Sequence, residues 1–290
     1  MFKIQLQNAF ELQFGKTPQV YGIHHIGGGE LNQNYKILSD IGLFFVKVNV
    51  KENLPKLFEK EQLAIKTLRK TNTIAVVNPI GIVEINNKKV FFLDFVEQAP
   101  RAKNFWGDFG TSLANLHKCT SSNFGFEEDN YIASYLQKNK TSNNWGTFYT
   151  KNRLIPAVKF ASGLMLLQSG HLNKFEKVYE IAEFAFSNEI PSLLHGNLWH
   201  HHIITATDGK ALLCNPSSYY GHREMDIAMT KMLGGFHQEF YEAYNANYPL
   251  SSDWEIRLDF CQIYYELVNL CNYGTAYLPA VEARLNKWVK

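Results

Sequence analysis

The chain has 290 residues, of which 46% are hydrophobic, and a formal net charge of +2. This length can bury a large core, and it allows one large domain or two lobes. The near balance of charge, without a dense stripe of Lys and Arg, argues against a nucleic-acid-binding surface. No apolar stretch approaches the ~18 residues that a membrane span needs.

Cysteine spacing and the N-terminus bear on the compartment. The four cysteines stand singly, without CxxC or metal-ligand spacing, which predicts reduced thiols and a cytoplasmic protein. Charges and glutamines interrupt every apolar run of residues 1–16, so we expect no signal peptide. We expect neither nucleic acid nor membrane as a partner, and the sequence leaves the oligomeric state open.

The N-terminal part predicts one helix followed by strands. Residues 1–16 fit a helix, and three strands are expected at 21–26, 34–38 and 43–48. The first two strands are separated by Gly27, Gly28 and Gly29. A turn of this kind lets backbone N–H groups approach phosphate oxygens because no Cβ intervenes. An ordinary tight turn is the alternative.

Lys47 is the single charge in the apolar strand that spans residues 43–48. A charged group in such a strand requires an anionic partner. Downstream, apolar residues at helical spacing from Leu57 to Leu68 place Glu61 on or beside the buried face of a helix. The two side chains are therefore expected to pair. The alternative is that Lys47 reaches a sheet edge while Glu61 is solvated.

Two further strands are expected at residues 79–84 and 89–96. The second leaves the sheet toward Pro100 with a polar break, which is typical of a hinge between lobes. We place the boundary near Glu97, which gives an N-terminal lobe of residues 1–96 and a C-terminal lobe of residues 97–290.

The C-terminal part is predicted to be mainly helical. Residues 121–153 are polar with interspersed aromatic residues and are expected to form a long functional loop. Helices are expected at 105–119, 155–168, 174–188, 225–232, 238–245, 254–271 and 279–289.

The stretch around which the chain is organised follows the helix expected at 174–188 and leads into the one expected at 225–232. Residues 193–225 read LLHGNLWHHHIITATDGKALLCNPSSYYGHREM. Two short apolar runs flank the turn Asp208-Gly209-Lys210, so this stretch predicts a loop followed by a tight hairpin.

The stretch resembles the catalytic and metal loops of the fructosamine (ketosamine) kinase family, within the kinase-like, aminoglycoside phosphotransferase-like superfamily. The family pattern is H-G-D-L-W-S-G-N, a hairpin, D-P-A, and then Y-Y-G-H-R-E-x-D-x-A-M. The matching residues are His195, Gly196, Leu198, Trp199, Pro216, Tyr219, Tyr220, Gly221, His222, Arg223, Glu224, Asp226, Ala228 and Met229. The resemblance extends over nearly the whole chain from about Gly27.

The resemblance implies a two-lobed, protein-kinase-like α+β fold with a small antiparallel-sheet N-lobe and a larger helical C-lobe. It also implies an ATP-dependent transferase that phosphorylates a sugar hydroxyl of a glycated amine, a small-molecule substrate, with Mg²⁺ as the family's metal. By resemblance the nucleotide lies against Gly27, Gly28, Gly29, Lys47, Glu61, Asp94, Phe95 and Val96. Trp199, Tyr219 and Asp226 are the candidates for substrate contact; a structural ion pair between Asp226 and Arg223 is the alternative for Asp226.

The charged groups of the pattern are replaced. Asn197 stands at the position of the family's base aspartate, His202 at that of the metal-binding asparagine, and Asn215 at that of the metal-binding aspartate. Asparagine is not basic at physiological pH, and Mg²⁺ prefers hard anionic oxygen. The sequence therefore predicts impaired transfer and argues against an ordinary Mg²⁺ site.

Three hypotheses for the function follow. The protein is either a slow kinase of this class or a pseudokinase that holds nucleotide or ligand without turnover. The third hypothesis is a transition-metal site built from His200, His201 and His202, with His195 and His222 nearby.

Overall fold

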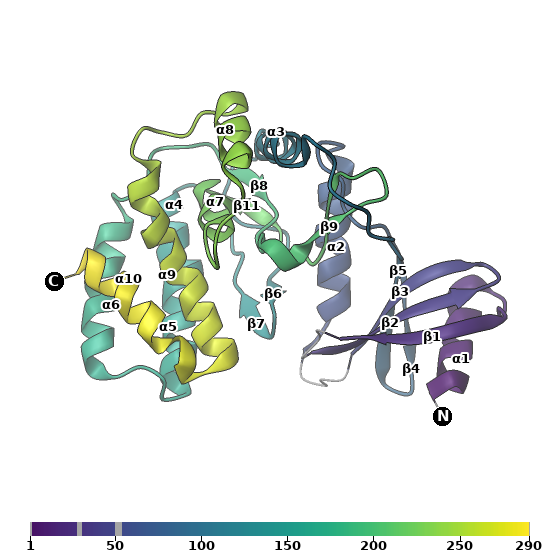
Figure 1. The fold of residues 1–290 in the computed structure, drawn as a ribbon. Helices are drawn as coiled ribbons and strands as arrows, with labels where there is room; N and C mark the ends of the chain where they lie inside the picture. The colour runs from purple at the N-terminus through teal and green to yellow at the C-terminus, as the bar shows by residue number, and fades with distance from the viewer. Residues whose placement is uncertain (1, 28–30, 50–53, 290) are drawn as a thin grey trace.

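The computed structural model describes residues 2–27, 31–49 and 54–289. A five-stranded antiparallel sheet precedes a larger, mainly helical part, so the predicted α+β class is confirmed (Figure 1). The sheet has the order β1-β2-β3-β5-β4, and its strands are β1 (Val20–Ile26), β2 (Asn32–Ser39), β3 (Gly42–Asn49), β4 (Pro79–Ile85) and β5 (Lys88–Asp94). The division at residues 96 and 97 remains a prediction; β5 ends at Asp94, and the next helix begins at Phe105.

One helix packs on each face of the sheet, and the alternation of side chains along β5 explains why. Val90 and Phe92 join the core under α1 (Phe2–Phe14), whereas Phe91 and Leu93 join the core under α2 (Leu57–Lys70). Successive strand residues point to opposite faces, so a fully apolar strand needs a cover on both. Lys47 in β3 is out of phase with the α1-facing residues, which directs it toward α2.

The helical part is built around α9 (Trp254–Tyr273), which packs on α5, α7 and α10 (Figure 1). Its other helices are α3 (Phe105–His117), α4 (Trp145–Phe148), α5 (Ile155–Gly163), α6 (Ser169–Ala182), α7 (Glu224–Thr230), α8 (Gln238–Asn247) and α10 (Leu278–Trp288). In the part of the chain that the structure describes, no helix combines the length and apolarity needed to span a membrane.

Two helix predictions had wrong bounds. The helix predicted at 155–168 ends at Gly163, and the one predicted at 174–188 begins at Ser169 and ends at Ala182. The second start is fixed by a reciprocal cap, in which the Gln168 side chain accepts from the backbone N–H of His171 and the His171 ring accepts from the Gln168 N–H. Such a cap uses neither Ser nor Thr, so the sequence pattern does not reveal it.

The segment predicted as a long loop, residues 121–153, contains regular structure. It forms a small hairpin of β6 (Asn130–Ile132) and β7 (Tyr135–Gln137), then α4 and a π-helical turn (Tyr149–Leu154). The segment also reaches α2: the Lys60 ammonium donates to Glu128 Oε2 at 2.9 Å and to the Asp129 carbonyl. It therefore connects the helical part to a helix that packs on the sheet.

Two short antiparallel pairs hold the central stretch. β8 (Ser192–Leu194) pairs with β11 (Tyr219–Gly221), and β9 (Ile203–Thr205) pairs with β10 (Ala211–Leu213). The predicted hairpin around residues 208–210 is confirmed. The chain between β8 and β9 and the chain after β10 are thereby brought side by side.

Candidate functional site

Lys47 lies where the sheet, α2 and the end of the central hairpin meet. Its ammonium donates to Glu61 Oε1 at 2.6 Å and to Asn215 Oδ1 at 2.6 Å. The side chains of Lys47 and Glu61 are 9% and 14% exposed, so this is a buried ion pair with an added neutral acceptor. The pairing predicted from the sequence is present, and Asn215 joins it.

The loop after β8 is shaped by Gly196 and Asp226. Gly196 has φ of +77°, and a Cβ built there would lie 2.2 Å from the Ser217 carbonyl oxygen, so only glycine fits. The Asp226 carboxylate is fully buried and accepts the N–H groups of His195 and Gly196 at 2.7 and 2.9 Å. Charge-assisted bonds of this kind hold the loop in one conformation.

Asn197 follows directly and faces Asn215. It is 8% exposed, and its Nδ2 donates to the Asn215 carbonyl oxygen at 3.2 Å. Asn197 and Asn215 therefore converge beside Lys47. Asn215 has φ of +53°, a left-handed backbone that Asn and Asp tolerate better than most residues.

Both ring nitrogens of His202 are engaged. Nδ1 lies 2.7 Å from the Asn197 carbonyl oxygen and donates to it, while Nε2 accepts from the Trp199 indole N–H at 3.3 Å. Burial lowers the pKa of His202 to about 3, so the ring is neutral. His202 supports Asn197 and Trp199 rather than offering a free lone pair.

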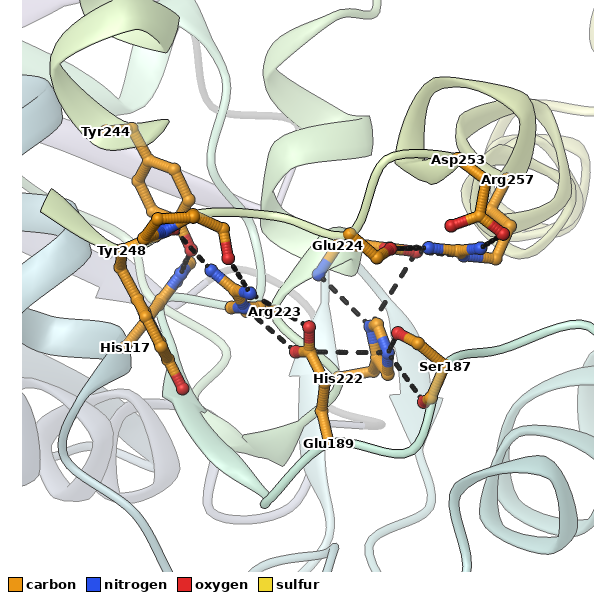
Figure 2. A network of polar contacts seen from close by, with 12 residues as sticks. His117, Ser187, Glu189, His222, Arg223, Glu224, Tyr244, Tyr248, Asp253 and Arg257 are labelled. Carbon is orange, nitrogen blue, oxygen red and sulfur yellow. Dashed lines mark hydrogen bonds and ion pairs between the residues drawn. The ribbon is translucent and has the colours of Figure 1, made fainter. Parts of the chain in front are cut away.

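The three consecutive histidines diverge. His200 Nε2 lies 2.6 Å from the Gly235 carbonyl oxygen, and the His201 ring packs on Trp199 with 4.4 Å between centroids. His222 is buried elsewhere, beside Ser187 and Glu189 (Figure 2). Over residues 2–27, 31–49 and 54–289, no three His, Cys, Asp or Glu side chains gather as metal ligands, so the transition-metal hypothesis was wrong there.

A cleft of about 1060 Å³ opens between the sheet and the helical part. Nine of the residues predicted for the base, nucleotide, metal and substrate positions line it: Lys47, Glu61, Asp94, Phe95, Val96, Asn197, Trp199, His202 and Asn215. Gly27 is exposed and follows Ile26, which lines the cleft, while Gly28 and Gly29 lie outside the described residues. Most of the predicted site is thus one continuous surface.

Two backbone N–H groups of the expected hinge already donate to carbonyl groups of the N-terminal part. The Asp94 N–H donates to the Asn78 carbonyl at 3.0 Å, and the Phe95 N–H donates to the Leu43 carbonyl at 3.2 Å. An adenine ring bound beside these two residues would have to contact their carbonyl oxygens or side chains.

Tyr219 and Asp226 were predicted to contact substrate, and the structure places both away from the cleft lining. Each is fully buried. The Tyr219 ring stacks on Phe148 and lies under the Arg153 guanidinium, 4.0 Å from its carbon, while Asp226 binds the loop amides. We therefore assign both residues supporting roles.

The alternative for Asp226, an ion pair with Arg223, is also absent. Arg223 instead makes a bidentate ion pair with Glu189, in which Nε donates to Oε2 at 2.8 Å and Nη2 donates to Oε1 at 2.9 Å (Figure 2). Nearby, Arg257 pairs with the fully buried Glu224 in the same manner. These pairs fix α7 against its neighbours, and the Asp226 carboxylate contacts the loop amides and His117 Nε2, which lies 3.3 Å from Oδ2.

The opposite wall of the cleft was anticipated only in part: the sequence marked residues 121–153 as a functional segment but did not assign the helical residues of this wall to the site. It is formed by Asn130, Tyr131, Ile132 and Ala133 from the β6 hairpin and by Met229, Met232, Tyr265, Asn269 and Asn272 from α7, the segment after it and α9. The helical residues share the apolar periodicity of a core helix, which hides them. Two asparagines one turn apart near the end of α9, Asn269 and Asn272, are a signal that could have revealed the helical part of this wall.

Comparison with known proteins shows which sequences and folds this chain resembles. The fructosamine kinase family model matches residues 3–290. A probable ketoamine kinase from Enterococcus faecium is 32% identical over 267 residues, covering 90% of this chain and 93% of that protein. The crystal structure of a putative fructosamine-3-kinase from Haemophilus somnus has a TM-score of 0.89 at 26% identity, covering 100% of this chain and 98% of that one.

The fold is shared more widely. A spectinomycin phosphotransferase solved in complex with ADP and spectinomycin has a TM-score of 0.62 at 13% identity, covering 98% of this chain and 92% of that one; at this identity the likeness concerns the fold alone. With a family model matched over almost the full length, the chain belongs to the fructosamine kinase family.

Proposed function

We propose that the protein binds ATP in the cleft between the sheet and the helical part and transfers its terminal phosphoryl group only slowly to a sugar hydroxyl of a glycated amine. One observation carries the proposal: the Lys47 ammonium, held by Glu61 and Asn215, faces the same cleft as Asn197. An ammonium so placed is suited to nucleotide phosphates, and Asn197 marks the place where an acceptor hydroxyl would be received.

Slow transfer follows from the chemistry of Asn197. Its amide oxygen can accept a hydrogen bond and orient a hydroxyl, but it cannot take up the proton. General-base catalysis is typically worth about 10²- to 10⁴-fold, or roughly 3 to 5 kcal/mol. Orientation and electrostatic stabilisation by Lys47 remain.

Magnesium does not fit the residues present. Asn215 Oδ1 accepts from the Lys47 ammonium at 2.6 Å, and both His202 nitrogens are engaged. Mg²⁺ requires hard oxygen ligands, usually carboxylates. The residues present therefore do not form an ordinary Mg²⁺ site.

The same hydrogen bond favours a second candidate, a pseudokinase that holds nucleotide without turnover. A family aspartate at position 215 would present a negative oxygen to a metal, whereas here the neutral oxygen is bound to Lys47. Under either function we place the protein in the cytoplasm, with residues 1–96 cradling the nucleotide and residues 97–290 receiving the acceptor.

A transfer assay separates the two candidates. The native chain and the double variant Asn197→Asp, Asn215→Asp are incubated with labelled ATP and a fructose-derived amine, and phosphorylated product is measured. Measurable native turnover that rises about 10²-fold or more in the double variant supports the slow kinase. A silent native chain that still binds ATP supports the pseudokinase, and a chain that binds no ATP refutes both.

A further inference from the structure

The phosphate end of the cleft is arranged for a nucleotide without a divalent cation. An ammonium has three N–H donors, and those of Lys47 that are accounted for in the described part of the chain go to Glu61 and Asn215, each at 2.6 Å. The third remains for a phosphate oxygen. Lys47 can thus bind the nucleotide while keeping both side-chain partners.

The charge count points the same way. At positions 197 and 215 the family pattern has aspartates and this chain has asparagines, so two negative charges are absent beside Lys47. Their absence changes the local charge by as much as one bound divalent ion would. Two carboxylates would repel a triphosphate unless a cation lay between them, and two neutral amides do not.

The neutral amides are also locked in place. Asn215 Oδ1 is bound to Lys47, and Asn197 Nδ2 is bound to the Asn215 backbone. To ligate a cation, Asn215 Oδ1 would have to bring a second positive charge next to the Lys47 ammonium that it already accepts. Two positive charges on one neutral oxygen are electrostatically unfavourable.

We propose that this protein binds ATP as the metal-free nucleotide, with Lys47 supplying the cation contact and Asn215 preventing divalent-ion binding. The inference rests on the proposed nucleotide site and specifies the form of nucleotide that the site takes. Metal-free ATP carries more negative charge than the magnesium complex, so it should bind the Lys47 ammonium at least as tightly.

Isothermal titration calorimetry with ATP, in excess EDTA and in excess MgCl₂, tests the inference. For the native chain we expect a Kd in EDTA on the order of tenfold lower than that in MgCl₂, because excess Mg²⁺ leaves little metal-free ATP. A Kd that is equal under the two conditions, or lower in MgCl₂, overturns the inference while leaving the nucleotide site intact. Absence of binding under both conditions overturns the proposed function itself, and the inference with it.

Asn215→Asp tests the role of the amide. Both residues tolerate the left-handed backbone at φ of +53°, so the change alters charge without strain. We expect this variant to bind ATP on the order of tenfold more weakly than the native chain in EDTA and to recover in MgCl₂. Asn123→Asp, the same change at an exposed residue outside the cleft lining, should bind as the native chain does. If the Kd of the Asn215→Asp variant for ATP is the same in EDTA and in MgCl₂, the role assigned to Asn215 is overturned.

Discussion

Replacing Asp226 by asparagine should destabilise the loop that carries Asn197. The buried carboxylate accepts the N–H groups of His195 and Gly196 at 2.7 and 2.9 Å. An amide keeps one acceptor oxygen but turns an NH₂ group toward the second backbone donor, which then loses its partner. Hydrogen bonds to charged groups contribute roughly 1.5–3 kcal/mol each, and an unsatisfied buried donor costs about 1–3 kcal/mol. We expect a total loss of about 3–5 kcal/mol.

Thermal unfolding followed by circular dichroism measures this loss. At roughly 2–3 °C per kcal/mol for a chain of this size, Tm should fall by about 6–15 °C. Asp259→Asn is the matched control, because that carboxylate is 26% exposed and pairs with Arg284 and Lys287 near the surface. The control should cost less than about 1 kcal/mol. Equal shifts in the two variants would refute the idea that Asp226 holds the loop.

Three further outcomes are expected. Lys47→Ala should weaken ATP binding on the order of tenfold or more, since the ammonium is lost, and an unchanged Kd by calorimetry would remove Lys47 from the site. Stability should fall as the pH drops from about 6.5 toward 4, because burial lowers the pKa of His195 to about 4 and of His202 to about 3, so that only the unfolded chain takes up these protons. Tm measured between about pH 7.5 and pH 5 checks the sign, and His202→Gln should flatten the curve. Lys60→Met should lower Tm by only about 1–2 °C, because the partner Glu128 is 38% exposed, and high salt should reduce the difference.

The sheet and the Lys47 contact were predictable because local sequence determines them. Strands apolar on both faces require covers on both faces, and a lone lysine in such a strand requires an acceptor. The five strands were therefore placed to within two residues at each end, and the partner Glu61 was identified. Asn215, the second acceptor, comes from a segment 168 residues away, and only the motif resemblance brought it into consideration.

The errors share a physical cause. A motif gives the identity of a residue but not the direction of its side chain, so Tyr219 and Asp226 were assigned to substrate although both point into the core. Composition was equally misleading for residues 121–153, where the polar side chains serve internal contacts. Arg153, for example, is fully buried and donates to Asn139 Oδ1 at 2.9 Å.

Two consecutive residues of α2 bind partners on opposite sides of the cleft. Glu61 holds the Lys47 ammonium, while Lys60 holds Glu128 and the Asp129 carbonyl in the segment that supplies Asn130 to the far wall of the cleft. A rigid helix cannot move one of these residues without the other. Any ligand that pulls the β6 hairpin toward or away from the sheet must either break the Lys60 contact or shift Glu61, so the two halves of the cleft are mechanically linked through a single turn of helix.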